Sequence, residues 1–214
     1  MDYSKTLLLI IDVQNDFCPG GTLAVNDGDG VVHPLNALSS FLAEKGGRVA
    51  ATQDWHPIGH ISFASSHSGK KIGDSVDTAL VKSQTLWPDH CVQGTGGAAF
   101  HKDLNLSPVS LIIRKGFRKE LDSYSAFFEN DRQTPTGLEG WIKSLGLETV
   151  IMGGLATDYC VFYSAMDCKK AGFKTIIASD AVRGVGFPSG SVEAAVSEMK
   201  SNGIEFISSG ELVK

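Results

Sequence analysis

The 214-residue chain has no run or stripe of Lys and Arg, and its formal net charge is −5 at pH 7. Proteins that bind nucleic acid or an anionic membrane surface use clustered cationic side chains for that contact. We therefore expect neither partner. The mildly negative charge is typical of a small soluble protein.

Long apolar segments are absent as well. The N-terminal apolar run Thr6–Ile11 is far shorter than the roughly 20 residues that a membrane-spanning helix needs. Asp2 stands where a secretory leader would carry cationic residues, and no small-residue cleavage site follows the run. We expect no membrane segment and no leader.

Cysteine is scarce. The four residues Cys18, Cys91, Cys160 and Cys168 show no C-x-x-C spacing. In a chain of this length they are not the pattern of a disulfide scaffold. A reducing, cytoplasmic setting is the simplest prediction.

A glycine-rich phosphate loop is missing after the first apolar run. Ile11 is followed by residues 12–16, DVQND, whose carboxylates repel phosphate. This disfavours a non-catalytic nucleotide-binding module, which is the alternative from a different functional class.

The order of apolar runs and helical spacings indicates an α/β protein. Strand-like runs occur at residues 7–11, 48–52, 109–113, 149–152, 175–178 and 204–206, and helical spacing occurs at residues 31–44, 138–145, 157–170 and 189–202. This alternation predicts a mostly parallel sheet with helices on both faces, in a single domain over residues 1–214. The exception is residues 53–105, a connection whose length suggests a functional role.

Cys160 is the first candidate for catalysis. It follows the strand-like run 149–152 and a turn that contains Gly153 and Gly154, and a helical segment begins beside it. Backbone N–H groups and the positive end of a helix favour a thiolate and an oxyanion. The position predicts the nucleophile of a cysteine amidohydrolase, and the alternative is a buried structural thiol.

Two further polar residues stand at expected strand ends. Asp12 follows residues 7–11, and Lys115 follows residues 109–113. The carboxyl ends of parallel strands share one edge of a sheet, so both could meet Cys160 there. Asp12 would exchange protons with the nucleophile and the leaving amine, and Lys115 would hold that carboxylate. Taken singly, each also suits a turn or a solvated strand end.

A candidate metal site begins at Asp54 and His56. These residues are two apart in an extended segment, so both side chains can point the same way. A histidine from a distant loop, such as His90, would complete a set of two imidazoles and one carboxylate that suits Zn²⁺, Fe²⁺ or Mn²⁺. His60 is a reserve ligand. The alternative is a pair of solvated loop residues.

Six separated motifs occur along the chain, at residues 12–18 (DVQNDFC), 54–64 (DWHP with HISFA), 87–95 (WPDHCVQGT), 114–116 (RKG), 122–127 (DSYSAF) and 154–161 (GLATDYCV). In order and spacing they resemble the nicotinamidases of the isochorismatase-like cysteine hydrolase superfamily. The resemblance implies a three-layer α/β/α, Rossmann-like fold around about six mostly parallel strands. It also implies hydrolysis of nicotinamide to nicotinate and ammonia in NAD recycling, through a thioester on the cysteine.

The resemblance carries over residue by residue. It assigns catalysis to Asp12, Lys115 and Cys160, and one divalent ion, zinc first and iron or manganese as alternatives, to Asp54, His56 and His90. The ion would hold the pyridine nitrogen of the substrate.

The family pattern also implies a cis peptide bond at Leu155-Ala156 and an oxyanion hole formed by the N–H groups of Ala156 and Cys160. Substrate binding is assigned to Phe17, Trp87, Leu155 and Tyr124, and Tyr159 occupies a variable position that could tune the pocket. Pyrazinamide-like analogues are expected substrates, and a homo-oligomer is left open.

Three other reactions compete with this reading. Relatives that cleave vinyl ethers or N-carbamoyl groups lack the metal set, so Asp54, His56 and His90 argue against them. A hydrolase that uses metal-bound water would not need Cys160, so substitution of that residue separates the two mechanisms.

Overall fold

The computed structural model describes residues 1–214 and is built on a sheet of six parallel strands in the order β5-β2-β1-β6-β7-β8. The strands are β1 (Thr6–Ile11), β2 (Arg48–Asp54), β5 (Val109–Lys115), β6 (Thr149–Leu155), β7 (Lys174–Arg183) and β8 (Glu205–Ile207). The expected parallel α/β fold is confirmed.

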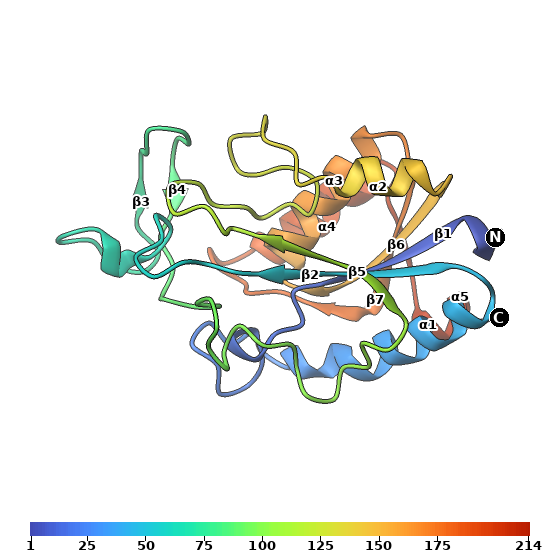
Figure 1. The fold of residues 1–214 in the computed structure, drawn as a ribbon. Helices are drawn as coiled ribbons and strands as arrows, with labels where there is room; N and C mark the ends of the chain where they lie inside the picture. Colours follow the sequence, from blue (N-terminus) through green and yellow to red (C-terminus); the bar gives the residue numbers. More distant parts are fainter.

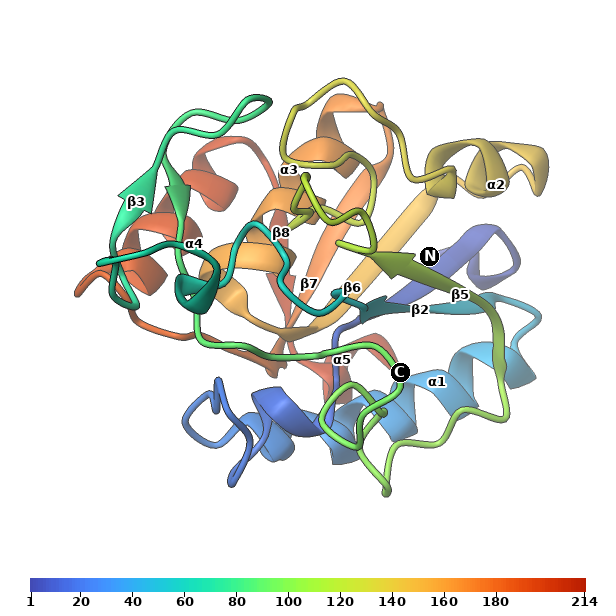
Figure 2. The same ribbon diagram turned by 60° about the vertical axis from the view of Figure 1, so that its left-hand side comes forward.

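Helices cover both faces of this sheet (Figures 1 and 2). One face carries α1 (Val32–Glu44) and the short α5 (Ser209–Leu212), and the other carries α2 (Leu138–Ser144), α3 (Phe162–Lys170) and α4 (Ser191–Ser201). The result is the three-layer arrangement expected from the alternating sequence pattern. None of these helices is long and apolar enough to cross a membrane.

The central strand β1 shows why the run Thr6–Ile11 is uniformly apolar after its first residue. Side chains of a strand alternate between faces, so Leu8 and Ile10 pack under α1, whereas Leu7, Leu9 and Ile11 pack toward the opposite helices. All six residues of β1 are buried. Full burial of each such side chain contributes about 1.5–3 kcal/mol.

The strand order fixes where a ligand can bind. The chain passes from β1 outward to β2 and β5, and then returns to the other side of β1 with β6. Such a switch point opens a crevice at the carboxyl ends of the strands. Asp12 follows β1, Lys115 ends β5, and Cys160 follows β6, so all three lie at this edge.

Residues 53–105 contain more structure than the sequence indicated. The short strands β3 (Ser75–Val76) and β4 (Gln84–Thr85) form an antiparallel hairpin, which projects from the end of the molecule opposite both termini (Figure 1). The segment also has a 3-10 turn at Ala64–Ser66. Two residues per strand are too few for a recognisable alternation of polar and apolar residues.

The helical segment that contains Cys160 also starts differently from the expected 157–170. Residues Thr157–Val161 form a wider π-helical turn, and regular α3 begins only at Phe162. Turns of this kind are frequent at functional sites. Likewise, α4 begins at Ser191, after Gly190 in a left-handed conformation.

Gly154 offers a test of how tightly β6 packs on β1. Its φ is +125°, and a methyl group there would overlap the carbonyl oxygen of Ile11. We expect Gly154→Ala to lower the free energy of unfolding by about 3 kcal/mol or more through strain and overlap, as measured by urea denaturation. In contrast, Gly140→Ala in α2 meets no atom within 4 Å and should stabilise by about 0.5–1 kcal/mol. Equal stability of the two variants would contradict this packing.

Candidate active site

The Lys115 ammonium contacts both of the other candidate catalytic residues, Asp12 and Cys160. Its Nζ lies 2.8 Å from Asp12 Oδ2 and 3.3 Å from Cys160 Sγ. It also donates to Asp54 Oδ1 at 2.6 Å and to the carbonyl oxygen of Ser123 at 3.1 Å. Burial alone would lower the pKa of Lys115, but the carboxylates of Asp12 and Asp54 outweigh it and hold that pKa well above its usual value. Lys115 is therefore a permanent buried cation.

Asp12 is oriented by a threonine of the neighbouring strand. Its backbone N–H donates to Thr52 Oγ1 at 3.1 Å, and the Thr52 hydroxyl donates to Asp12 Oδ1 at 2.7 Å. The other oxygen, Oδ2, lies 2.8 Å from the Lys115 ammonium. Burial raises the pKa of Asp12, although the charge of Lys115 opposes the shift. A carboxylate of raised pKa beside a thiol is suited to proton exchange.

Cys160 lies in the turn Thr157–Val161, close to the peptide bond Leu155-Ala156, which is cis. Burial raises the pKa of the Cys160 thiol well above its usual value, and the Lys115 ammonium only partly opposes this. The shift is opposite to the one expected from the helix end alone, because the thiol is almost fully buried. If Cys160 is the nucleophile, a base is therefore needed to take its proton.

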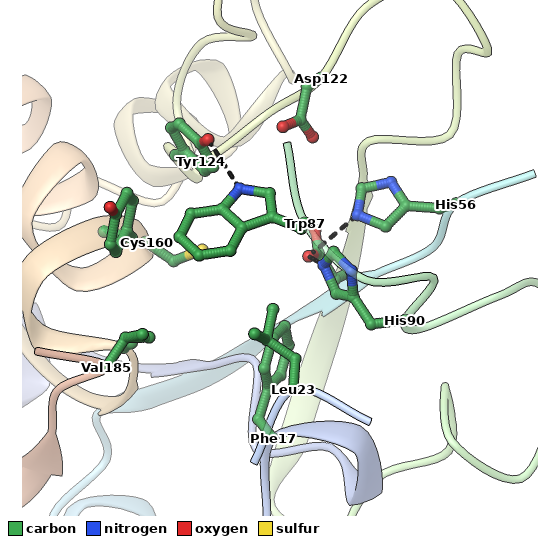
Figure 3. A pocket seen from close by; sticks show the side chains of 12 residues that line it. Phe17, Leu23, His56, Trp87, His90, Asp122, Tyr124, Cys160 and Val185 are labelled. Carbon is green, nitrogen blue, oxygen red and sulfur yellow. Dashed lines mark hydrogen bonds and ion pairs between the residues drawn. The ribbon is translucent and has the colours of Figure 1, made fainter. Parts of the chain in front are cut away.

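Asp54, His56 and His90 come together next to these residues, and Figure 3 shows the two imidazoles close to each other. Asp54 Oδ2 lies 3.2 Å from His56 Nε2 and 3.6 Å from His90 Nε2. In each imidazole Nδ1 faces a carbonyl oxygen, of Gly116 at 2.9 Å and of Pro88 at 2.8 Å, so Nδ1 carries the proton. The two Nε2 atoms and a carboxylate oxygen of Asp54 then lie within 4.8 Å of one another, a donor set that fits a divalent cation.

His60 takes a different position. Its ring stacks on that of His56 at a centroid distance of 4.2 Å, and it groups with His56 and Asp122 rather than with Asp54 and His90. His60 Nδ1 lies 2.7 Å from Ser62 Oγ. Burial lowers the pKa of His60 to about 4, so the ring is neutral at neutral pH.

A narrow pocket is lined by Cys160 and by the candidate metal ligands Asp54, His56 and His90. Figure 3 shows this pocket from close by. Apolar and aromatic side chains make up most of its wall, and the lining residues include Phe17, Leu23, Trp87, Tyr124, Ala156, Tyr159 and Val185. The Trp87 indole donates to the Tyr124 hydroxyl at 3.0 Å. Leu155, expected in the pocket, is instead packed in the core under α1, because its side chain points to that face of β6.

The comparisons with known proteins agree with this geometry. A family model described as the isochorismatase domain matches residues 6–211. A nicotinamidase from Acinetobacter baylyi is 45% identical over 206 residues, which cover 96% of this chain and 94% of that protein. This chain belongs to the nicotinamidase family of isochorismatase-domain hydrolases.

Solved structures support the same placement within the nicotinamidase family. A nicotinamidase/pyrazinamidase from Acinetobacter baumanii is 46% identical, with a TM-score of 0.93 and 98% of both chains covered. A pyrazinamidase from Pyrococcus horikoshii, solved in complex with zinc, is 34% identical with a TM-score of 0.77, and the match covers 95% of this chain and 99% of that one.

Some residues of this nicotinamidase-family site carried no signal in the sequence. Thr52 looked like an ordinary strand residue, and Val185 lies in the connection after β7. Asp122 belongs to a recognised motif but had no assigned role, yet it is buried in the pocket wall and accepts from Gln84 Nε2 at 3.0 Å. Only the folded chain brings these side chains to the pocket.

The metal content of a His90 variant tests directly whether the imidazoles of His56 and His90 bind a divalent ion. We expect His90→Ala to lower the affinity for a divalent ion by at least about 100-fold, because one of three ligands is lost. The measurement is elemental analysis of protein dialysed against zinc-buffered solution, with circular dichroism to confirm the fold. His67→Ala is the matched control, since His67 contacts the carbonyl oxygen of Ile61 outside this group. Equal metal content in both variants would contradict the assignment.

Proposed function

We propose that this chain hydrolyses nicotinamide to nicotinate and ammonia, as a step of NAD recycling. The observation that supports this best is the position of Lys115, whose ammonium contacts Asp12 and Cys160 on one side and Asp54 on the other. A nucleophile and a metal-ligand group thus line one aromatic pocket, and Lys115 joins the base Asp12 to both. The nicotinamidases among the relatives support the choice of amide.

The pocket suits a flat aromatic amide. Phe17, Trp87 and Tyr124 offer apolar ring faces, and such a ligand needs only a few polar handles. Asp54, His56 and His90 would hold a divalent ion, zinc first and iron or manganese as alternatives, which supplies a Lewis-acidic partner for the pyridine nitrogen when bound. Pyrazinamide-like analogues carry the same amide and an equivalent ring nitrogen, so we propose that they are accepted too.

The first half of the reaction uses the buried thiol. Asp12 Oδ2 takes the proton of Cys160 while the sulfur attacks the amide carbon. The carbonyl electrons move to oxygen, where the N–H groups of Ala156 and Cys160 stabilise the negative charge. Asp12 then returns its proton to the amine nitrogen, the C–N bond breaks, and ammonia leaves a nicotinoyl thioester.

In the second half Asp12 acts in the same way, with water as the attacking group and sulfur as the leaving group. Asp12 removes a proton from a water molecule, whose oxygen attacks the thioester carbon, and the C–S bond breaks. The proton goes back to sulfur, and the nicotinic acid so formed is released as nicotinate once its carboxyl group has lost its proton to solvent. Throughout, Lys115 neutralises the buried carboxylate and limits its movement. The four free cysteines accord with the reducing cytoplasmic setting that we propose for this chemistry.

Ammonia release from nicotinamide tests the function. We expect the metal-loaded protein to release ammonia and nicotinate in equal amounts. Cys160→Ala should lose nearly all turnover, because the covalent route depends on the thiol. Cys168→Ala is the matched control, since Cys168 is also buried but lies on α3, away from the pocket.

Two results would contradict this proposal in different ways. No ammonia from the metal-loaded wild-type protein would mean that nicotinamide is not the substrate. Substantial ammonia from Cys160→Ala would mean that water, and not the thiol, attacks the amide.

A further inference from the structure

One wall of the pocket is formed by a segment that has no regular secondary structure. Residues 184–190 connect β7 to α4, and Val185 of this segment faces the pocket (Figure 3). A connecting segment of this kind is free to move unless other contacts hold it. The contacts that hold this one come from the two residues just before the nucleophile.

Asp158 holds the first part of the segment. Its Oδ1 accepts from the backbone N–H of Val185 at 2.9 Å, and its Oδ2 accepts from the N–H of Gly186 at 2.9 Å and from Ser191 Oγ at 2.5 Å. Three donors on one buried carboxylate form strong, charge-assisted hydrogen bonds. Gly184 allows this approach, because a methyl group there would lie 3.2 Å from Asp158 Oδ1 and overlap Val192.

Tyr159 holds the next part. Its hydroxyl donates to the carbonyl oxygen of Phe187 at 2.6 Å. Its ring lines the pocket and meets the edge of Trp87 at a centroid distance of 4.9 Å. The Phe187 ring in turn packs near Trp87 and against Gly73 of the segment before β3. Asp158 and Tyr159 thus connect the backbone of the nucleophile to the pocket wall.

We propose that Asp158 and Tyr159 are positioning residues that fix the distance between Cys160 and the Val185 wall and so limit the size of the aromatic amide that binds. The substrate in this statement rests on the proposed function. The cavity between the walls measures about 30 Å³, which leaves little free space. A small displacement of one wall therefore changes which ring fits beside the sulfur.

The wall keeps its distance from the sulfur because Asp158, Tyr159 and Cys160 belong to one turn. Residues Thr157–Val161 are held at the end of β6 and lead into α3, so Asp158 and Tyr159 cannot shift without moving Cys160. A wall bound to these two residues keeps its place relative to the sulfur.

The test compares two amides and several variants. Tyr159→Phe removes only the hydroxyl, and Asp158→Asn replaces one acceptor oxygen with a donor that faces backbone N–H groups. For both we expect KM for nicotinamide to rise about tenfold, with a much smaller change in kcat. The ratio of kcat/KM for 5-methylnicotinamide to that for nicotinamide should rise. In Asp158→Asn the amides of Val185 and Gly186 should also exchange with deuterium faster.

Asp167→Asn is the matched control, because Asp167 is another buried carboxylate, paired with Arg132 and absent from the pocket wall. We expect Asp167→Asn to lower stability but to leave KM, and the ratio of kcat/KM for 5-methylnicotinamide to that for nicotinamide, unchanged. If Asp158→Asn does not fold, Ser191→Ala removes a single donor from the same carboxylate, and the test proceeds with this variant and Tyr159→Phe.

Wild-type KM and selectivity in the folded variants would overturn the positioning role and leave a purely structural one. No hydrolysis of either amide by the wild-type protein would instead overturn the proposed function, and with it the size limit. The two failures are distinguishable because the first requires an active wild-type enzyme.

Discussion

The buried ammonium of Lys115 is the interaction on which the site depends. A lone charge in a protein interior is strongly unfavourable, and partners must offset the loss of hydration. Here Asp12 and Asp54 lie 2.8 and 2.6 Å away. The order β5-β2-β1 brings these partners together, since Lys115 and Asp54 end paired strands and Asp12 follows the next one. The parallel sheet thus assembles the charges before any substrate contact is made.

The Lys115 ammonium contacts both the candidate nucleophile and a candidate metal ligand. It lies 3.3 Å from the Cys160 sulfur, and its partner Asp54 is also a candidate metal ligand. Two carboxylates then share one cation, which leaves an excess of negative charge that suits a bound dication. The proton exchange proposed for Asp12 and the substrate orientation proposed for the metal site are therefore electrostatically coupled, although different residues carry them.

The sequence predicted the elements that depend on local pattern. The uniformly apolar β1 and the polar residues at strand ends led to the sheet and to the convergence of Asp12, Lys115 and Cys160. It did not reveal Thr52, whose contact with Asp12 depends on how β2 aligns with β1. Nor did it give the direction of the pKa shift of Cys160, because burial is a property of the folded chain. The hydrogen bonds that Asp158 accepts from the segment 184–190 likewise form only in the tertiary structure, so the sequence did not reveal them.

The most direct test of this account is intact-protein mass spectrometry of enzyme quenched in acid during turnover of nicotinamide. The account predicts a fraction of the protein that is heavier by one nicotinoyl group, with the added mass on the peptide that contains Cys160. The adduct should disappear when the substrate is exhausted. Continued ammonia release with no adduct on any time scale sampled, and with full turnover by Cys160→Ala, would contradict a thioester mechanism and favour attack by metal-bound water.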